Sequence, residues 1–277
     1  MRRLISKRNG MIGFFLVLLV LIAGIFAPYI APYDPYDIDM DVALSPPTFA
    51  HPLGTDFFGR DVLSRLLVGA RISLQVSVLA RLIAVALGAL LGLCAGYFGG
   101  RVDHIVMRLA DVTLAYPGLL LLIAVMAAVG PSLTSLIIAL GAVGWAGVAR
   151  LVRAQVLSLK EREFVLAIRS IGGSPLNIMF RHLLPNCSSQ LIVIFSMGLG
   201  MAVMAESSMS FLGLGAQPPL PSWGSMISSG LDYLRVAPWL SLAPGVAITL
   251  EVLGFNLLGD ALRDVLDPKL SGSGGRL

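Results

Sequence analysis

Long apolar runs alternate with short polar segments along most of this chain. A helical run of about 20 apolar residues is long enough to cross the hydrocarbon core of a bilayer. The pattern therefore predicts an all-α membrane protein with about six transmembrane helices. The predicted spans cover residues 11–30, 73–97, 104–129, 132–157, 188–212 and 239–262.

One charged segment, residues 161–185, lies between the fourth and fifth predicted spans. Its first part has apolar residues at i, i+4 and i+7, which form one face of a short helix: Phe164, Ile168 and Ile171. Gly172 and Gly173 then break the helix, and Ser174-Pro175 is typical of the start of a second one. The apolar positions of that second helix are Leu176, Met179, Phe180 and Leu183, and Pro185 is predicted to end it. We therefore expect two short amphipathic helices outside the bilayer, suited to docking a soluble partner.

Composition agrees with a polytopic membrane protein. Hydrophobic residues make up 56% of the 277 residues and charged residues only 13%, whereas a soluble domain has about 25% charged residues. The net charge of +4 does not indicate nucleic-acid binding, because the charges flank the apolar runs. Cys94 and Cys187 are far apart and are expected to be small apolar fillers rather than a disulfide. The basic N-terminus lacks a clear cleavage site, so the first run is expected to remain as a span.

The distribution of Lys and Arg predicts the orientation. With the N-terminus inside, 15 of them fall on the cytoplasmic side and 4 outside, and Arg81 lies within a span. Basic residues are enriched on the cytoplasmic side of membrane proteins. Both termini and residues 158–187 are therefore predicted to face the cytoplasm.

The outer segment 28–72 contains six prolines between Pro28 and Pro52. Their spacing disfavours helix and sheet, so we expect an extended chain along the outer surface. An amphipathic helix is predicted to follow and to lead into the second span. Its apolar positions are Leu63, Leu66, Leu67 and Ala70.

Three ionisable residues lie within or near predicted spans, where an isolated charge is costly. They are Arg81, Glu206 and Glu251. One interpretation places them in a translocation pathway or proton relay. The other is an ion pair between helices, for example Arg81 with Glu251, or side chains that reach an interface. Glu206 is expected near the outer mouth.

Glycines recur at spacings that let membrane helices approach closely. They are Gly88, Gly92 and Gly96 in the second span and Gly141, Gly144 and Gly147 in the fourth. Packing within one subunit and a seam between subunits both remain open.

No catalytic constellation, metal site or cofactor site is predicted. The three histidines are scattered, and no GxxxxGK[ST] phosphate loop occurs, so ATP is not expected to bind here by that route. We therefore expect a protein that is not itself an enzyme.

The segment 163–185 resembles the coupling loop of ATP-binding cassette importer permeases. Ala167, Gly172, Leu184 and Pro185 match that motif, whereas Leu166, Ile168 and His182 replace its usual Glu, Ala and Ile. Glu161 and Glu163 are the nearby acidic residues. Further motifs are similar to the C subunits of dipeptide, oligopeptide and nickel permeases, for example His51-Pro-Leu-Gly-Thr-Asp56 and Phe255-Asn-Leu-Leu-Gly-Asp260. The matching stretches are residues 51–67, 95–103, 180–186, 210–215, 221–226 and 255–268.

This resemblance implies a type I importer permease with defined partners. These are a homologous B-type permease, two cytoplasmic ATPases that bind ATP and Mg, an extracytoplasmic binding protein and the bilayer of the cell inner membrane. The side chains expected to fill an ATPase groove are Phe164, Leu166, Ala167, Ile168 and Ile171, and Gly172-Gly173 would permit the chain reversal. The expected parts are residues 1–72 (first span, outer segment and elbow helix), 73–267 (permease core, with coupling helices at 161–185) and 268–277 (cytoplasmic tail).

The cargo is predicted to be di- or oligopeptides. Nickel or a metal chelate and glutathione-like peptides are the alternatives within the resemblance. An ion-coupled secondary transporter or a membrane scaffold would be a different class, but the chain shows no internal repeat and only one plausible deep carboxylate, Glu251.

Overall fold

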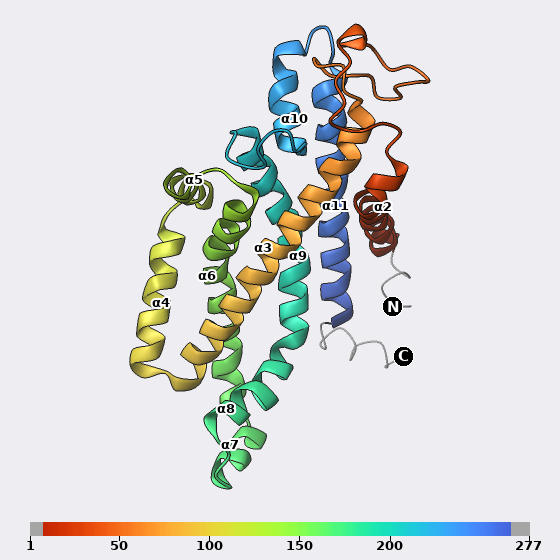
Figure 1. Cartoon of the computed structure of the whole chain (residues 1–277). Coiled ribbons are helices and arrows are strands. Elements are labelled where there is room, and N and C mark those ends of the chain that lie inside the picture. Colours follow the sequence, from red (N-terminus) through yellow and green to blue (C-terminus); the bar gives the residue numbers. More distant parts are fainter. Residues whose placement is uncertain (1–7, 267–277) are drawn as a thin grey trace.

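The computed structural model describes residues 8–266 and forms an elongated bundle of helices (Figure 1). The long helices are α2 (Arg8–Ile30), α3 (Val62–Phe98), α6 (Leu133–Lys160), α9 (Leu184–Phe211) and α11 (Trp239–Leu266). The shorter ones are α4 (Gly100–Ala115), α5 (Gly118–Val129), α7 (Glu163–Ser170), α8 (Pro175–Asn177) and α10 (Trp223–Gly230). Single helical turns are η1 (Met40–Val42), η2 (Ile178–Leu183) and η3 (Leu231–Tyr233). Within residues 8–266, five helical stretches are long and apolar enough to cross a membrane, or six if the bent α4–α5 pair is one span. The all-α multi-pass architecture is therefore confirmed.

Helices α3 and α6 form the most extensive helix–helix contact. Three glycines of α3 make it possible, because Gly88, Gly92 and Gly96 lie directly against Val148, Ala149 and Val156 of α6. A Cβ atom on Gly92 would lie 2.5 Å from the carbonyl oxygen of Ala149. These glycines therefore serve packing within one subunit, as the first of the two interpretations predicted.

Contacts between helices show which helix ends share one end of the bundle. Residue numbers rise together along α3 and α6, so these two helices run parallel. Helices α9 and α11 run in opposite directions, with Gly200 beside Asn256, and the start of α2 at Gly13 lies against Leu258 near the end of α11. The ends of α3, α6 and α11 thus lie with the starts of α2 and α9, at the end that carries α7 (Figure 1). The sequence predicted this grouping; that this end faces the cytoplasm remains a prediction.

The third predicted span, 104–129, is wrong as a single helix. Helices α4 and α5 meet at a bend of 95°, and α5 lies across the bundle rather than along it (Figure 1). The reason is local: Pro117 disfavours a helical backbone at Tyr116, and Tyr116 has an extended conformation with ψ of 142°.

The outer segment is more compact than the extended chain that was predicted. Residues 31–61 form turns, η1 and one isolated bridge between Thr55 and Asp61. The indole of Trp239 donates to the carbonyl of Thr55, and His51 Nδ1 lies 3.0 Å from Asp61 Oδ1. Pro28 lies inside α2, contrary to the prediction. The other five prolines fall within residues 31–61, which form no α-helix or strand and are held by side-chain hydrogen bonds instead. The predicted elbow helix is continuous with the second span in α3, so the expected boundary at residue 72 falls inside one helix.

The prediction that Pro185 ends a short helix is also wrong. Residues 175–211 form one continuous helical stretch, in which η2 is a π-helical turn. Pro185 lacks an N–H to donate, and it lies directly after this wider turn, at the start of α9. The second amphipathic helix is therefore the end of a membrane-spanning helix.

Candidate functional site

The tip of the bundle beyond α6 is formed by α7 and the turn that follows it (Figure 1). The sequence favours a short helix here because Glu163 lies in the first turn and Arg169 in the last, where each charge complements the helix dipole. Only Val165 of α7 is fully buried. It packs in an apolar cluster with Leu159, Ile178 and Met179, so α6 and η2 both anchor the helix.

The exposed side of α7 carries apolar side chains. Phe164 is 39% exposed, Leu166 44% and Ile171 85%, and Ala167 and Glu163 are also exposed. Large apolar side chains gathered outside a membrane commonly mark an interaction surface. We name Glu163, Phe164, Leu166, Ala167 and Ile171 the α7 face.

Ile168 does not belong to this face. It is half-buried and packs against the same cluster as Val165, so the face predicted from Phe164, Ile168 and Ile171 is rotated. Sequence reasoning missed Val165 as the anchor, although the pair Val165 and Ile168 has the i, i+3 spacing of a buried stripe.

The remaining predicted coupling residues surround α7 rather than join its face. Glu161 is exposed at the end of α6. Leu184 packs against the cluster that buries Val165, and Pro185 is exposed at the start of α9. Gly172 has a φ of +82° and reverses the chain after α7, and Gly173 leaves no room for a Cβ, which would lie 2.5 Å from Ile168 Cγ2.

Within the bundle, Arg81 of α3 lines a cavity of about 300 Å³. Its Nη2 donates to the carbonyl of Ile194 at 2.7 Å, while its buried Nε has no hydrogen-bond partner among residues 8–266. The guanidinium crosses α9 at Gly198, where any Cβ would overlap it. The other cavity walls are apolar and come from α5, α6 and α9, among them Leu119, Leu122, Val143 and Met201.

Glu206 and Glu251 are fully buried, and neither belongs to the lining of the cavity at Arg81. The hydroxyl of Ser73 donates to Glu251 Oε2 at 3.1 Å, and Ser210 donates to Glu206 Oε1 at 2.8 Å. Ser73 also interacts with Glu206, so the two carboxyl groups join α3, α9 and α11. The Arg81–Glu251 ion pair, one of the predicted alternatives, is not formed, and Glu206 lies inside the bundle rather than at an open mouth.

Two family models match the chain. The model described as "Binding-protein-dependent transport system inner membrane component" covers residues 88–272, and "N-terminal TM domain of oligopeptide transport permease C" covers residues 1–47.

Curated relatives are similar over almost the whole length. The glutathione transport system permease protein GsiD of Pectobacterium atrosepticum is 45% identical over 259 residues, which are 93% of this chain and 86% of the relative. A putative peptide transport system permease protein of Brucella suis biovar 1 is 43% identical over 273 residues, or 99% and 92% of the two chains. GsiD of an Escherichia coli strain is 45% identical over 272 residues, or 98% and 90%. With its apolar spans and these matches, the chain belongs to the binding-protein-dependent transport system inner membrane components, as a multi-pass, C-type permease subunit of an ATP-binding cassette importer.

Proposed function

We propose that this chain is one of two permease subunits that move di- and oligopeptides across the inner membrane by alternating access, driven by ATP hydrolysis in partner subunits. The partners would be a homologous B-type permease, two cytoplasmic ATPases that bind ATP and Mg, and an extracytoplasmic binding protein. A peptide cargo is supported by relatives whose names specify glutathione or peptides.

The exposed α7 face is the observation that carries the coupling part of this proposal. A short helix can transmit motion only if it is held rigidly on one side and bound on the other. Val165 anchors α7 to α6 and η2, while Leu166 and Ile171 remain exposed. Because Leu166 occupies the usual glutamate position of the motif, docking on an ATPase would depend on apolar contact more than on one ion pair.

The α4–α5 bend supports a second permease subunit. Tyr116 and Pro117 are exposed at the bend, yet a non-helical backbone at membrane depth is tolerated only where protein buries it or water surrounds it. The neighbouring exposed side chains are apolar, including Leu120 at 60% and Met201 at 76%. A homologous subunit packed over α5 and α9 would cover both features.

Arg81 is our candidate for a contact with cargo in the translocation pathway. Its guanidinium lines a cavity whose walls are otherwise mostly apolar, so it would attract the carboxylate of a peptide. Glu206 and Glu251 are assigned a different part: they hold α3, α9 and α11 together and do not reach cargo in this conformation.

The coupling proposal can be tested with the complete transporter in proteoliposomes. Leu166→Glu places a charge on the α7 face and is expected to abolish uptake and to weaken ATPase association. Leu231→Glu makes the same change at an exposed position in η3, at the opposite end of the bundle, and controls for insertion. Normal uptake by Leu166→Glu would overturn the coupling role.

The cargo and the driving force need separate measurements. Unlabelled dipeptide should compete with labelled peptide uptake, and Arg81→Gln should raise the KM for peptide. Competition by Ni²⁺ alone would favour the nickel alternative. Uptake that needs an ion gradient and no ATPase subunit would identify an ion-coupled transporter instead.

A further inference from the structure

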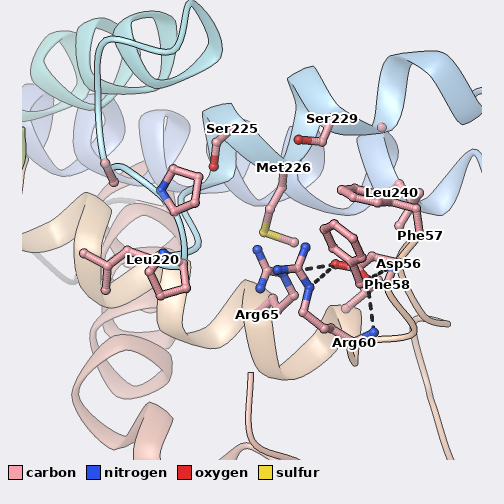
Figure 2. Close-up of a pocket in the computed structure, with 15 residues that line it drawn as sticks. Asp56, Phe57, Phe58, Arg60, Arg65, Leu220, Ser225, Met226, Ser229 and Leu240 are labelled. Atoms are coloured by element: carbon pink, nitrogen blue, oxygen red, sulfur yellow. Dashed lines mark hydrogen bonds and ion pairs between the residues drawn. The ribbon is translucent and has the colours of Figure 1, made fainter. Parts of the chain in front are cut away.

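We call the end of the bundle opposite α7, formed by residues 31–61 and 212–238, the outer cap (Figure 1). A pocket of about 160 Å³ opens in this cap (Figure 2). It is smaller than pockets for drug-sized ligands, which have about 300–1,000 Å³. The turn at residues 56–60, the start of α3, the 216–220 loop and α10 form its walls. In Figure 2 the guanidinium groups of Arg60 and Arg65 lie close together beneath Met226.

The two arginines share one carboxylate. Asp56 Oδ2 lies 2.7 Å from Arg60 Nε and 3.5 Å from Arg65 Nε. The other oxygen, Oδ1, accepts from the backbone N–H groups of Phe58 and Arg60 at 2.8 and 3.0 Å. Both oxygens of the Asp56 carboxylate therefore already accept hydrogen bonds from within residues 56–60. Arg60, Arg65 and Asp56 together carry a net charge of one positive unit.

Donors remain available in this pocket. Each guanidinium has five N–H donors. Arg65 uses Nη1 to donate to the carbonyl of Pro35 at 2.9 Å. Arg60 donates to Asp56 through Nε, and its two terminal nitrogens form no hydrogen bond with any of residues 8–266. The rings of Phe57 and Phe58 lie 5.6 and 4.7 Å from the Arg60 guanidinium carbon, so the group is held in place before any ligand arrives. Holding a group in its bound position reduces the entropy lost on binding.

The surrounding charge is of the opposite sign. The outer segments carry seven Asp and four Arg, and two of those four are Arg60 and Arg65. An approaching anion is therefore repelled by most of the outer cap and attracted at this pocket. A single arginine often binds a carboxylate through two parallel N–H···O hydrogen bonds.

We propose that this pocket receives a side-chain carboxylate of the extracytoplasmic binding protein and so fixes where that protein docks. The inference rests on the proposed function, because it requires such a partner. The pocket is formed by the outer turn, loop and α10, and it shares no lining residue with the cavity at Arg81. This separation favours a docking contact over a contact with cargo during passage.

The test measures the affinity of the binding protein that co-purifies with the transporter, using the complete transporter in nanodiscs and surface plasmon resonance. Arg60→Gln removes the free donors and is expected to weaken binding at least about tenfold, as truncation of a charge pair at an interface does. Ser229→Asp leaves both arginines intact and adds a carboxylate at the exposed pocket wall, so it should weaken binding similarly. Ser229→Asn shows how much of that loss comes from size alone.

Arg235→Gln is the matched control. Arg235 is exposed on the same cap but does not line the pocket, so its loss should change the affinity less than about twofold, as for a rim charge screened by salt. Wild-type affinity in both Arg60→Gln and Ser229→Asp would overturn the proposal. Unchanged affinity with a raised KM for cargo would assign the carboxylate to the cargo instead. If wild-type transporter binds no such protein, the proposed function itself fails, and this differs from a loss confined to the pocket variants.

Discussion

The turn at Gly172 offers the sharpest test of α7 as a rigid coupling element. Gly172 has a φ of +82°, and a Cβ at this position would meet nothing within 4 Å. The Cβ of a larger residue therefore has room, and the penalty at this position is backbone strain. A left-handed backbone costs an ordinary L-residue about 1–2 kcal/mol, and a β-branched residue such as valine is the least tolerant.

This strain matters because α7 is too short to be stable as an isolated helix. The helix has eight residues, whereas isolated helices need about 12–15 residues to be even marginally stable in water. Its shape therefore depends on the anchor at Val165 and on the turn at Gly172. A penalty of about 1–2 kcal/mol lowers the population of the native turn relative to its alternatives by a factor of about 5–30.

The assay is ATP-driven peptide uptake per ATP hydrolysed in proteoliposomes. Gly172→Val is expected to lower this ratio about tenfold while membrane insertion stays normal, because each 1.4 kcal/mol corresponds to a factor of ten. Gly172→Asn is the matched control, since asparagine adopts the left-handed conformation more readily, and it should keep most of the coupling. A wild-type ratio in Gly172→Val would refute the reasoning.

Three further predictions concern the packing of the bundle. Gly92→Ala should lower the free energy of unfolding, measured by thermal denaturation, by about 1–3 kcal/mol, because its Cβ would lie 2.5 Å from a carbonyl oxygen of α6. Gly147→Ala is the control and should leave the melting temperature unchanged, because a Cβ on Gly147 meets nothing within 4 Å. Asp61→Ala should cost about 1–2 kcal/mol in the same thermal assay, since Asp61 caps α3 by accepting from the Ser64 N–H at 2.7 Å; an unchanged melting temperature would show that the cap is dispensable. Ser73→Ala removes the donor to buried Glu251 and should destabilise by about 1–3 kcal/mol, and combining it with Glu251→Gln should lessen the loss; additive losses would contradict the coupling.

The residues that the sequence placed correctly owe their position to local properties. Apolar length located four of the spans as long helices and the fifth within the 175–211 stretch. Charge placement grouped the helix ends that the structure brings together. The α4–α5 bend could also have been predicted from the sequence, because Tyr116-Pro117 disfavours a continuous helix.

Other features depended on neighbours that lie far away in the sequence. The inward side of α7 is set by contact with α6 and η2, so Val165 is buried and Ile168 turns away from the exposed face. The apolar spacing of Phe164, Ile168 and Ile171 could not reveal this, because the apolar residues of α7 are spread over more than one side of the helix.

The sequence by itself determined that this chain crosses a membrane several times and carries a charged, amphipathic segment between two of its spans. Both follow from hydrophobicity and charge, which each residue carries wherever the chain folds. Only the tertiary structure decided that Arg81 lines a cavity while Glu206 and Glu251 are sealed between helices, and that Arg60 and Arg65 share Asp56 in one pocket. The physical reason is that burial, hydrogen bonding and cavity shape are properties of packed helices, and they arise only when distant segments meet.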